Sequence, residues 1–559
     1  MISIKLKSTF LLFTTVLLLM GCGSVNIVST PIENIDSVQL KVNKLTEDEK
    51  KQWGHADLLT DTIPGMSIDK TYSEIIGKKK GATVIVAVLD SGIDITHEDL
   101  NDVIWTNKRE KPGNGKDDDG NGYVDDIHGY NFLGNAYNEQ LEYTRILRLK
   151  LGDEAMQAKA RKKLDAEYKE ASDAKKNISA NKQQTEQILQ VVKKADADIK
   201  KHLGKDSYTK EEVNAVETTD ANLQRSVSII SQMYSYGDSI PEVLGLIESD
   251  IENFTEGLAY YSEKLDYHLN VGFDGRKVVG DNPYDIADRG YGDGNPLNRD
   301  KEESHGTHVA GIIAAERDNN LGVNGVANNV EIMSIRAVPN GDEYDKDVAL
   351  GIRYAVDNGA KIINASFGKA FSLNPEWVYD AIKYAAENDV LIVHAAGNDG
   401  NDLDDPKNTN YPKDFMDNGS EFADNVITIG ALNETYGSEM VATFSNYGTN
   451  NVDVFAPGGA IYSTMPGGTY KYQGGTSMAA PAVSGIAALI RSHFPKLSAS
   501  EVKQILMDSG LSTKVSVILD GDPSKARPFD KISKSGKMVN AYNALIMANN
   551  KSEEKSKLP

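Results

Sequence analysis

The chain has 559 residues, 40% of them hydrophobic, which is enough for more than one domain and an ample core. Its formal net charge of -22 argues against a nucleic-acid-binding protein, because such a protein needs a basic face. It contains one cysteine, Cys22, which excludes a disulfide within the chain.

The N-terminus has the pattern of a secretory signal. Two lysines precede an apolar run over residues 10–20, which is too short to span a bilayer. The following Leu19-Met20-Gly21-Cys22 resembles a bacterial lipobox, which implies a lipid on Cys22; an ordinary signal peptide is the alternative. We predict a lipoprotein signal peptide over residues 1–21 and a lipid anchor to the bacterial cell envelope, facing the periplasm or the outer surface.

A polar N-terminal segment, residues 22–65, precedes the first predicted strand. Thr46 and Glu49 in this segment have the spacing of a capping box and predict the start of a helix. Residues 83–89 are apolar and rich in β-branched side chains, so they predict a buried strand that ends at Asp90. Because open α/β sheets place functional sites at the carboxyl ends of their strands, Asp90 is a candidate site residue.

An acidic run follows, with oxygen donors at every second position from Asp117 onward, as in the first half of an EF-hand calcium loop. His128 stands where that loop has its closing glutamate, so Asp125 or Asp126 would have to complete the shell. A solvated acidic turn is the alternative. The ligands of the calcium site that we predict are Asp117, Asp119, Asn121, Tyr123 and Asp125.

Residues 135–270 change in composition and predict an inserted all-α hairpin or small bundle. Apolar residues recur at helical spacing, first at Met156, Ala160, Leu164, Tyr168 and Ala171, then at Ile188, Val191, Ala195 and Ile199. A seam with steps of four and three follows at Ile247, Ile251, Phe254, Leu258, Tyr261 and Leu265. The insertion is expected to be a solvated spacer, or else an arm that docks a partner or gates a substrate.

From residue 300 onward, predicted strands and helices alternate. The strands are expected at residues 331–338, 361–367, 390–396 and 426–430, and the helices at 305–315, 347–358, 375–388, 478–494 and 540–548, with Ser498 capping another. This alternation predicts a mostly parallel sheet covered on both faces, a three-layer α/β fold. The charged tail, residues 547–559, is predicted to be disordered.

Ser477 lies at the start of the predicted helix 478–494, directly after two glycines and Thr476. The unpaired N–H groups and the dipole of a helix N-terminus favour developing negative charge, so a serine here is a candidate nucleophile if a base and an acid are supplied from elsewhere. The alternative is a helix N-cap serine.

Three segments carry a family resemblance: LDSGID around Asp90, SHGTHVAG around His305 and GGTSMAAP around Ser477. In this order they resemble the subtilisin-like serine proteases, the subtilase family. The resemblance implies a catalytic domain over residues 66–134 and 271–546, with Ser477 as nucleophile, His305 as base and Asp90 as its partner. His308 would then be a packed structural histidine; a metal-binding pair lacks the third ligand or HExxH pattern that zinc sites have.

The same resemblance implies further site residues. Asn398, which ends the segment Ala395-Ala396-Gly397-Asn398, would supply the side-chain donor of an oxyanion hole. The implied substrate-binding residues are Ser366, Phe367, Gly368, Gly397 and Asn410, and the implied ligands of a second calcium site are Asp99, Asn319, Leu321 and Val323. A neutral Asn410 favours uncharged or apolar P1 side chains, whereas the nearby Asp399, Asp402, Asp404 and Asp405 could favour basic ones.

The expected function is therefore that of a serine endopeptidase with structural calcium, protein or peptide substrates and no nucleic-acid partner. One rival is a binding or scaffold protein that keeps the fold and works through its helical arm. An esterase or lipase is the other, but Gly475-Thr476-Ser477-Met478-Ala479 lacks the second glycine of a nucleophile elbow.

Overall fold

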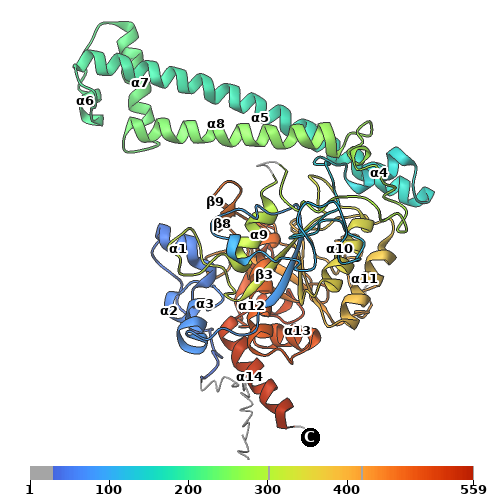
Figure 1. The fold of residues 1–559 in the computed structure, drawn as a ribbon. Coiled ribbons are helices and arrows are strands. Elements are labelled where there is room, and N and C mark those ends of the chain that lie inside the picture. Colours follow the sequence, from blue (N-terminus) through green and yellow to red (C-terminus); the bar gives the residue numbers. More distant parts are fainter. Residues whose placement is uncertain (1–28, 300–302, 417–418, 558–559) are drawn as a thin grey trace, which may run out of the picture.

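A computed structural model describes residues 29–299, 303–416 and 419–557 (Figure 1). Its centre is a parallel seven-stranded sheet with the strand order β2-β3-β1-β4-β5-β6-β7. The strands are β1 Val84–Asp90, β2 Gly129–Asn131, β3 Val330–Arg336, β4 Ile362–Ala365, β5 Leu391–Ala395, β6 Val426–Leu432 and β7 Val454–Pro457. The sequence predicted β1 and β3 to β6, but β2 and β7 are too short to give a clear apolar pattern.

Helices cover both faces of the sheet, so the predicted three-layer α/β fold is confirmed. Along β1, Val84, Val86 and Val88 face one apolar core, while Ala87 and Leu89 face the other, because successive strand residues point to opposite sides. The first core contains α9 His305–Ala314, α12 Thr476–His493, α13 Ala499–Asp508 and α14 Ala541–Lys557. The second contains α10 Asp345–Asp357 and α11 Pro375–Glu387.

The N-terminal segment is part of the core of the domain that contains the seven-stranded sheet, which its sequence did not indicate. Ile35, Trp53 and Leu58 are buried in the same core as α12, and the Trp53 indole donates to the Gly459 carbonyl at 3.1 Å. Thr46 and Glu49 form the predicted capping box. The helices of this segment and the residues after it are α1 Glu47–Gln52, a 3₁₀ turn Trp53–His55, α2 Leu58–Asp61, α3 Ile68–Thr71 and a π turn Tyr72–Ile76.

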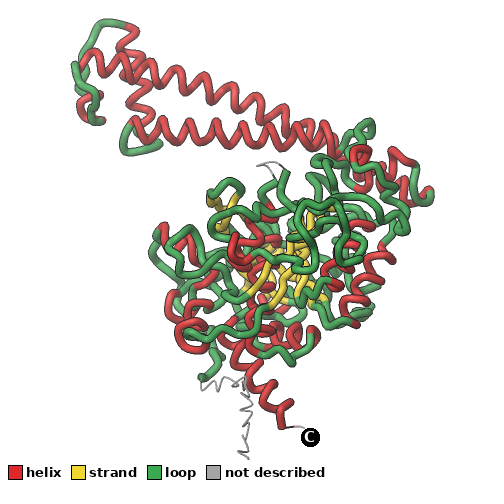
Figure 2. Tube along the Cα trace, in the orientation of Figure 1, coloured by secondary structure: helices red, strands yellow, loops and turns green. Residues whose placement is uncertain are grey.

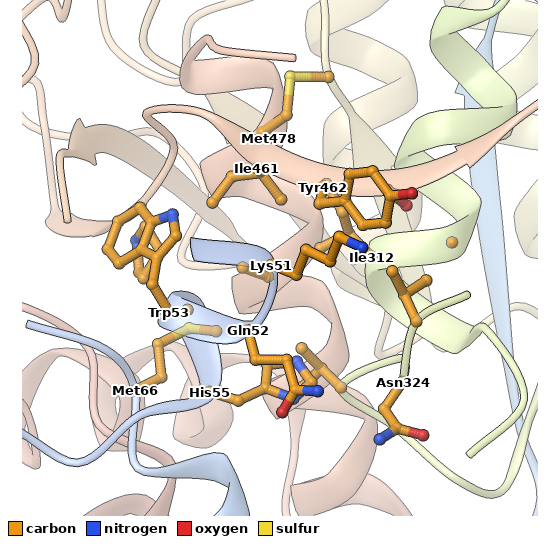
Figure 3. Close-up of a pocket in the computed structure, with 17 residues that line it drawn as sticks. Lys51, Gln52, Trp53, His55, Met66, Ile312, Asn324, Ile461, Tyr462 and Met478 are labelled. Carbon is orange, nitrogen blue, oxygen red and sulfur yellow. The ribbon is translucent and has the colours of Figure 1, made fainter. Parts of the chain in front are cut away.

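Figure 3 shows where this segment meets the domain that contains the seven-stranded sheet. Trp53 and Met66 line a small cavity of about 50 Å³ together with Met478, the residue after Ser477. The N-terminal segment therefore packs close to the first turn of α12.

The predicted disorder of the C-terminal tail is wrong for residues 547–557, because α14 continues to Lys557; residues 558–559 lie outside the described residues. Asn549 is buried, and Lys555 forms an ion pair of 2.5 Å with Glu501 of α13, so the added turns are held against the domain. Two hairpins were also not predicted: β8 Ile461–Met465 with β9 Thr469–Gln473, and β10 Ser516–Leu519 with β11 Asp522–Pro528.

A helical arm extends from the domain between β2 and α9 (Figures 1 and 2). Its longest helix has 50 residues and is therefore ~75 Å long; it ends at Gly204, which adopts the left-handed conformation with φ 64°. It packs along α8, and the two run side by side. The arm consists of α4 Glu142–Leu149, α5 Glu154–Leu203, α6 Lys210–Asn214, α7 Ala221–Met233, α8 Ile240–Glu263 and a π turn Lys264–His268.

The second predicted face of α5 is confirmed at Ala195 and Ile199, which are buried, but its first half is wrong by one residue. Leu189 and Val192 are buried, whereas the predicted Ile188 and Val191 are 40% and 45% exposed. Because apolar residues are adjacent in both pairs, spacing alone allows either face, and packing against α7 and α8 selects one. The seam predicted on α8 is half-buried along its length.

Among the helices of the described residues, we find none that is both long and apolar enough to cross a bilayer. The predicted signal peptide and Cys22 lie outside the described residues.

Candidate active site

Asp90, His305, Asn398 and Ser477 line one open cleft of about 530 Å³. Asp90 ends β1, and Asn398 comes three residues after the end of β5, so both lie at the carboxyl edge of the parallel sheet. His305 and Ser477 stand in the first turns of α9 and α12. The fold thus assembles four side chains that are far apart in the sequence.

Asp90 and His305 are in direct contact. The Nδ1 atom of His305 lies 2.8 Å from Oδ1 of Asp90, which is 1% exposed, while the imidazole is 37% exposed. Burial lowers the pKa of His305, but the adjacent Asp90 carboxylate outweighs it, so the net pKa is raised. With Nδ1 bound to Asp90, Nε2 is the ring atom that can accept a proton from the cleft.

This contact requires a glycine after the histidine. A Cβ on Gly306 would lie 2.3 Å from the Gly92 carbonyl oxygen, far inside contact distance. Gly306 therefore allows α9 to approach the end of β1 closely enough for His305 to reach Asp90.

The hydroxyl of Ser477 is held by Ser366, the residue that directly follows β4. Its Oγ donates to the carbonyl of Ser366 at 3.0 Å, and the Ser366 hydroxyl donates to the Ser477 carbonyl at 2.8 Å. The hydroxyl thus shares the cleft with the His305 imidazole while it is bonded to Ser366. Catalytic hydrogen bonds are often long or misaligned until a substrate binds.

Thr476 fixes the orientation of the Asn398 amide. The Asn398 Oδ1 atom accepts from the Thr476 backbone N–H at 2.8 Å and from its hydroxyl at 3.0 Å. Since Oδ1 is occupied, the Nδ2 group is the one available to donate to a ligand in the cleft. Thr476 was missed in the sequence, although it directly precedes Ser477; its Oγ1 also accepts from the Gly397 N–H.

The predicted substrate-binding residues line the same cleft: Ser366, Phe367, Gly368, Gly397 and Asn410. The Asn410 amide donates to the Ala395 carbonyl at 3.0 Å, and a Cβ on Gly368 would lie 2.2 Å from the Asn410 Oδ1 atom. Because Gly368 has no side chain, the Asn410 amide can pack against its backbone. Of the acidic residues considered for P1 selection, Asp399 lines the cleft, whereas Asp402 pairs with Arg527 at 3.1 Å.

His308 is a structural histidine in this arrangement. It is fully buried, its Nε2 lies 3.1 Å from the carbonyls of both Ile461 and Lys471, and burial lowers its pKa to about 4. A neutral ring that donates to two carbonyls ties α9 to the β8–β9 hairpin.

In the first predicted calcium loop, Glu110 lies with Asp117 and Asp119. Their ligand atoms are within 4.8 Å of one another. Glu110 is 6% exposed; its Oε1 accepts from the Asp118 and Asp119 N–H groups, and its Oε2 is buried with no hydrogen-bond partner among the described residues. A buried carboxylate oxygen without a partner is costly, so a bound cation fits this position.

The other predicted ligands of this loop have different contacts. Asp125 accepts from the Asn114 and Gly115 N–H groups, and so caps a turn. The Asn121 Oδ1 atom accepts from the Tyr123 N–H at 2.8 Å. Glu110 therefore joins Asp117 and Asp119 in this group, whereas the predicted Asp125 does not. Glu110 lies outside the EF-hand spacing and was not predicted.

The residues of the second predicted calcium site also lie together. The Asn319 amide donates to Asp99 Oδ1 at 2.7 Å, the Val323 N–H donates to Asp99 Oδ2 at 3.3 Å, and Asn319 Oδ1 accepts from the Leu321 N–H. These hydrogen bonds satisfy the Asp99 carboxylate, and a cation would have to replace them. Calcium at this site stays a prediction.

Comparison with known proteins places the chain in a family. The family model described as the subtilase family matches residues 81–527. The chain belongs to the subtilase family. This family of subtilisin-like serine proteases accounts for the seven-stranded α/β domain.

Individual relatives of this subtilase match over part of the chain. It is 41% identical over 237 residues to the thermophilic serine proteinase of Bacillus sp. (strain AK1), covering 42% of this chain and 52% of the relative. It is 38% identical to subtilisin DY of Bacillus licheniformis, covering 41% and 76%, and 38% identical to thermitase of Thermoactinomyces vulgaris, covering 39% and 68%. The chain thus spans about half the length of the first of these relatives.

Proposed function

We propose that this subtilase is a serine endopeptidase in which Asp90, His305 and Ser477 form the catalytic triad. The observation that carries the proposal is the 2.8 Å contact between His305 and the buried Asp90, in a cleft that also holds Ser477 and Asn398. A base whose partner fixes its tautomer, in the same cleft as a hydroxyl at a helix N-terminus, provides the groups that acyl transfer from a peptide requires.

In the proposed reaction, the Ser477 Oγ attacks the scissile carbonyl while His305 Nε2 takes its proton. Asp90 stabilises the imidazolium that forms, and His305 then returns the proton to the leaving amine. The negative oxygen of the tetrahedral intermediate accepts from the Asn398 Nδ2 group and the Ser477 backbone N–H. In the second half of the reaction, water attacks the acyl carbonyl while His305 Nε2 takes a proton from it. His305 then returns the proton to Ser477 Oγ, and the acyl group leaves as a carboxylic acid.

The proposed substrate is an extended peptide paired with residues 366–368 by strand addition, because backbone pairing is independent of sequence. Asn410, a neutral residue held by the Ala395 carbonyl, favours uncharged or apolar P1 side chains.

We propose a structural calcium ion held by Glu110, Asp117 and Asp119, supported by the unpartnered Glu110 oxygen. Asn121 and Tyr123 belong to the same loop, and Asp99, Asn319, Leu321 and Val323 form the second proposed site. Bound calcium would neutralise the clustered carboxylates and add its binding free energy to the stability of the fold.

Attachment to the bacterial envelope through a lipid on Cys22 is also a proposal. Metabolic labelling with a tagged fatty acid tests it: the wild-type chain should incorporate the label, and Cys22→Ser should not. Equal labelling of both chains would contradict it.

Covalent labelling with a fluorophosphonate probe tests the catalytic proposal. The wild-type chain should be labelled and should hydrolyse a denatured protein, and Ser477→Ala should do neither. An unlabelled wild-type chain would favour the scaffold alternative, and hydrolysis of simple esters without any proteolysis would favour the esterase.

A further inference from the structure

The base of the helical arm forms part of the wall of the catalytic cleft. Leu141, Tyr143, Lys163 and Glu167 line the same cleft as His305 and Ser477. Tyr143 belongs to α4, and Lys163 and Glu167 belong to the first part of α5, where the arm joins the domain near α10 (Figure 1). The arm is therefore positioned to contact a bound peptide.

Helix α4 is fixed to the cleft wall. The buried guanidinium of Arg145 donates to the carbonyls of Asp342 and Glu343 at 2.6 and 3.1 Å, and the Glu142 N–H donates to the Asp342 carboxylate at 2.7 Å. Asp342 and Glu343 both line the cleft. These contacts hold the arm base and residues 342–343 as one wall.

The chain before α4 adds backbone pairing to this wall. The Asn340 N–H donates to the Tyr137 carbonyl, and the Glu139 N–H donates to the Asn340 carbonyl, both at 2.9 Å. The wall therefore has fixed geometry, as a specificity pocket requires.

Two lysines and one glutamate lie together on the arm side. Glu167 Oε1 is 3.0 Å from the Lys163 ammonium, and Glu167 Oε2 is 2.9 Å from that of Lys264. Burial raises the pKa of Glu167, but the two lysines outweigh it, so the net pKa is lowered and the carboxylate is charged at neutral pH. Two ammonium groups around one carboxylate leave a net positive charge.

Lys163 presents that charge to solvent. Its side chain is 46% exposed, compared with 18% for Lys264 and 17% for Glu167. On the same wall, burial raises the pKa of Glu343 to about 8 and that of Asp342 to about 6, so these two carboxyls carry less negative charge near Lys163 than two ordinary ones would. Asp399, which is the exposed acid among the cleft-lining residues, follows Asn398 at the end where the reaction is proposed to occur.

We propose that the arm base forms a substrate subsite in which Lys163 selects an acidic side chain of the peptide, at a position away from the scissile bond. This inference rests on the proposed endopeptidase function and assigns part of its specificity to the inserted arm. Lys163 acts on substrate binding and takes no part in the chemical steps.

A peptide series that carries Glu, Gln or Lys at each position tests the proposal with wild type, Lys163→Ala and Lys163→Glu. The matched control is Lys193→Glu, because Lys193 is also on α5, is 47% exposed and pairs with Glu248 at 2.7 Å, but lies outside the cleft lining. At one position the wild type should prefer Glu, and Lys163→Glu should lower kcat/KM for that peptide about 5- to 20-fold, mainly through KM.

Lys163→Ala should show a smaller loss at the same position, and Lys193→Glu should match the wild type. An unchanged profile in Lys163→Glu, or an equal change in Lys193→Glu, would overturn the proposal. Fluorophosphonate labelling of each variant separates the two claims: an unlabelled wild type rejects the endopeptidase, whereas full labelling with an unchanged profile rejects only the subsite.

Discussion

Ser366 and Ser477 hold each other through a reciprocal pair of hydrogen bonds, in which each hydroxyl donates to the backbone carbonyl of the other residue, at 2.8 and 3.0 Å. The pair joins the strand proposed to bind substrate to the helix that carries the proposed nucleophile. For His305 to take the proton of Ser477, the Ser477 hydroxyl has to leave the Ser366 carbonyl. A peptide that pairs with residues 366–368 would lie next to the Ser366 carbonyl when the Ser477 hydroxyl leaves it.

Replacing Asp90 tests whether Asp90 orients His305 and raises its pKa. Asp90→Asn should lower kcat by about 10⁴-fold, because the carboxylate that orients the imidazole and stabilises its cation is lost. Asp90 raises the pKa of His305, and a neutral base is needed, so the acid limb of the wild-type pH profile should lie above the ordinary histidine range. In the variant this limb should move to lower pH, and an unmoved limb in a profile of kcat/KM against pH would contradict the assignment.

The same pair sets a pH dependence of stability. Because the pKa of His305 is raised in the folded state, its protonation stabilises the fold below about pH 6.5, and this contribution is lost as the pH rises through the raised pKa. The difference in Tm between wild type and Asp90→Asn should therefore change across this pH range.

Replacing Asn398 tests the oxyanion hole. Asn398→Ala should lower kcat about 10²- to 10³-fold with little change in KM; this magnitude is taken from subtilisin itself, a member of the same family. Asn408→Ala serves as the control, since the Asn408 amide donates to the Asp402 carbonyl and lies outside the cleft lining. A kcat for Asn398→Ala close to that of the control would remove Asn398 from the mechanism.

Calcium titration separates the ligands suggested by the sequence from those suggested by the structure. Calcium should raise the Tm of the wild type, and Glu110→Gln should reduce this shift because the unpartnered Oε2 is replaced by an amide nitrogen. Asp125→Asn should keep the shift, since Asp125 caps the Asn114 and Gly115 N–H groups. If Glu110→Gln kept the shift and Asp125→Asn reduced it, Asp125 would be the ligand instead of Glu110.

The N-terminal segment should be essential to stability. Trp53 is 2% exposed, so Trp53→Ala should lower the free energy of unfolding by about 3–5 kcal/mol, measured by chemical denaturation. Leu59→Ala, at a position 47% exposed in the same segment, should change it by no more than about 0.5 kcal/mol. Equal effects would mean that the segment does not share the catalytic core.

The sequence predicted the parts of the site that depend on local patterns. Asp90 ends a clear apolar strand, and Ser477 begins a helix of small residues, so both are candidates from local pattern; the triad with His305 follows from the resemblance of three short motifs to the subtilases. Thr476 and Glu110 were missed because their roles depend on partners in space: Thr476 on Asn398 after β5, and Glu110 on the loop that folds back over it.

In the arm and the tail, too, contacts between distant residues decided what the sequence could not predict. Spacing predicted the helices of the arm, but adjacent apolar residues on α5 gave two possible faces, and burial of Val192 rather than Val191 is decided by the helices packed against it. The tail is charged and reads as disordered, yet Lys555 is held by Glu501 of another helix.

By itself the sequence determined the layered α/β architecture through apolar periodicity, and it indicated the candidate triad through three short motifs that resemble those of the subtilases; both signals are properties of neighbouring residues. The tertiary structure alone decided that the N-terminal segment joins the catalytic core, that Glu110 joins the acidic loop and that the arm base reaches the cleft. These features depend on which distant surfaces exclude water together, and no local pattern along the chain encodes that pairing.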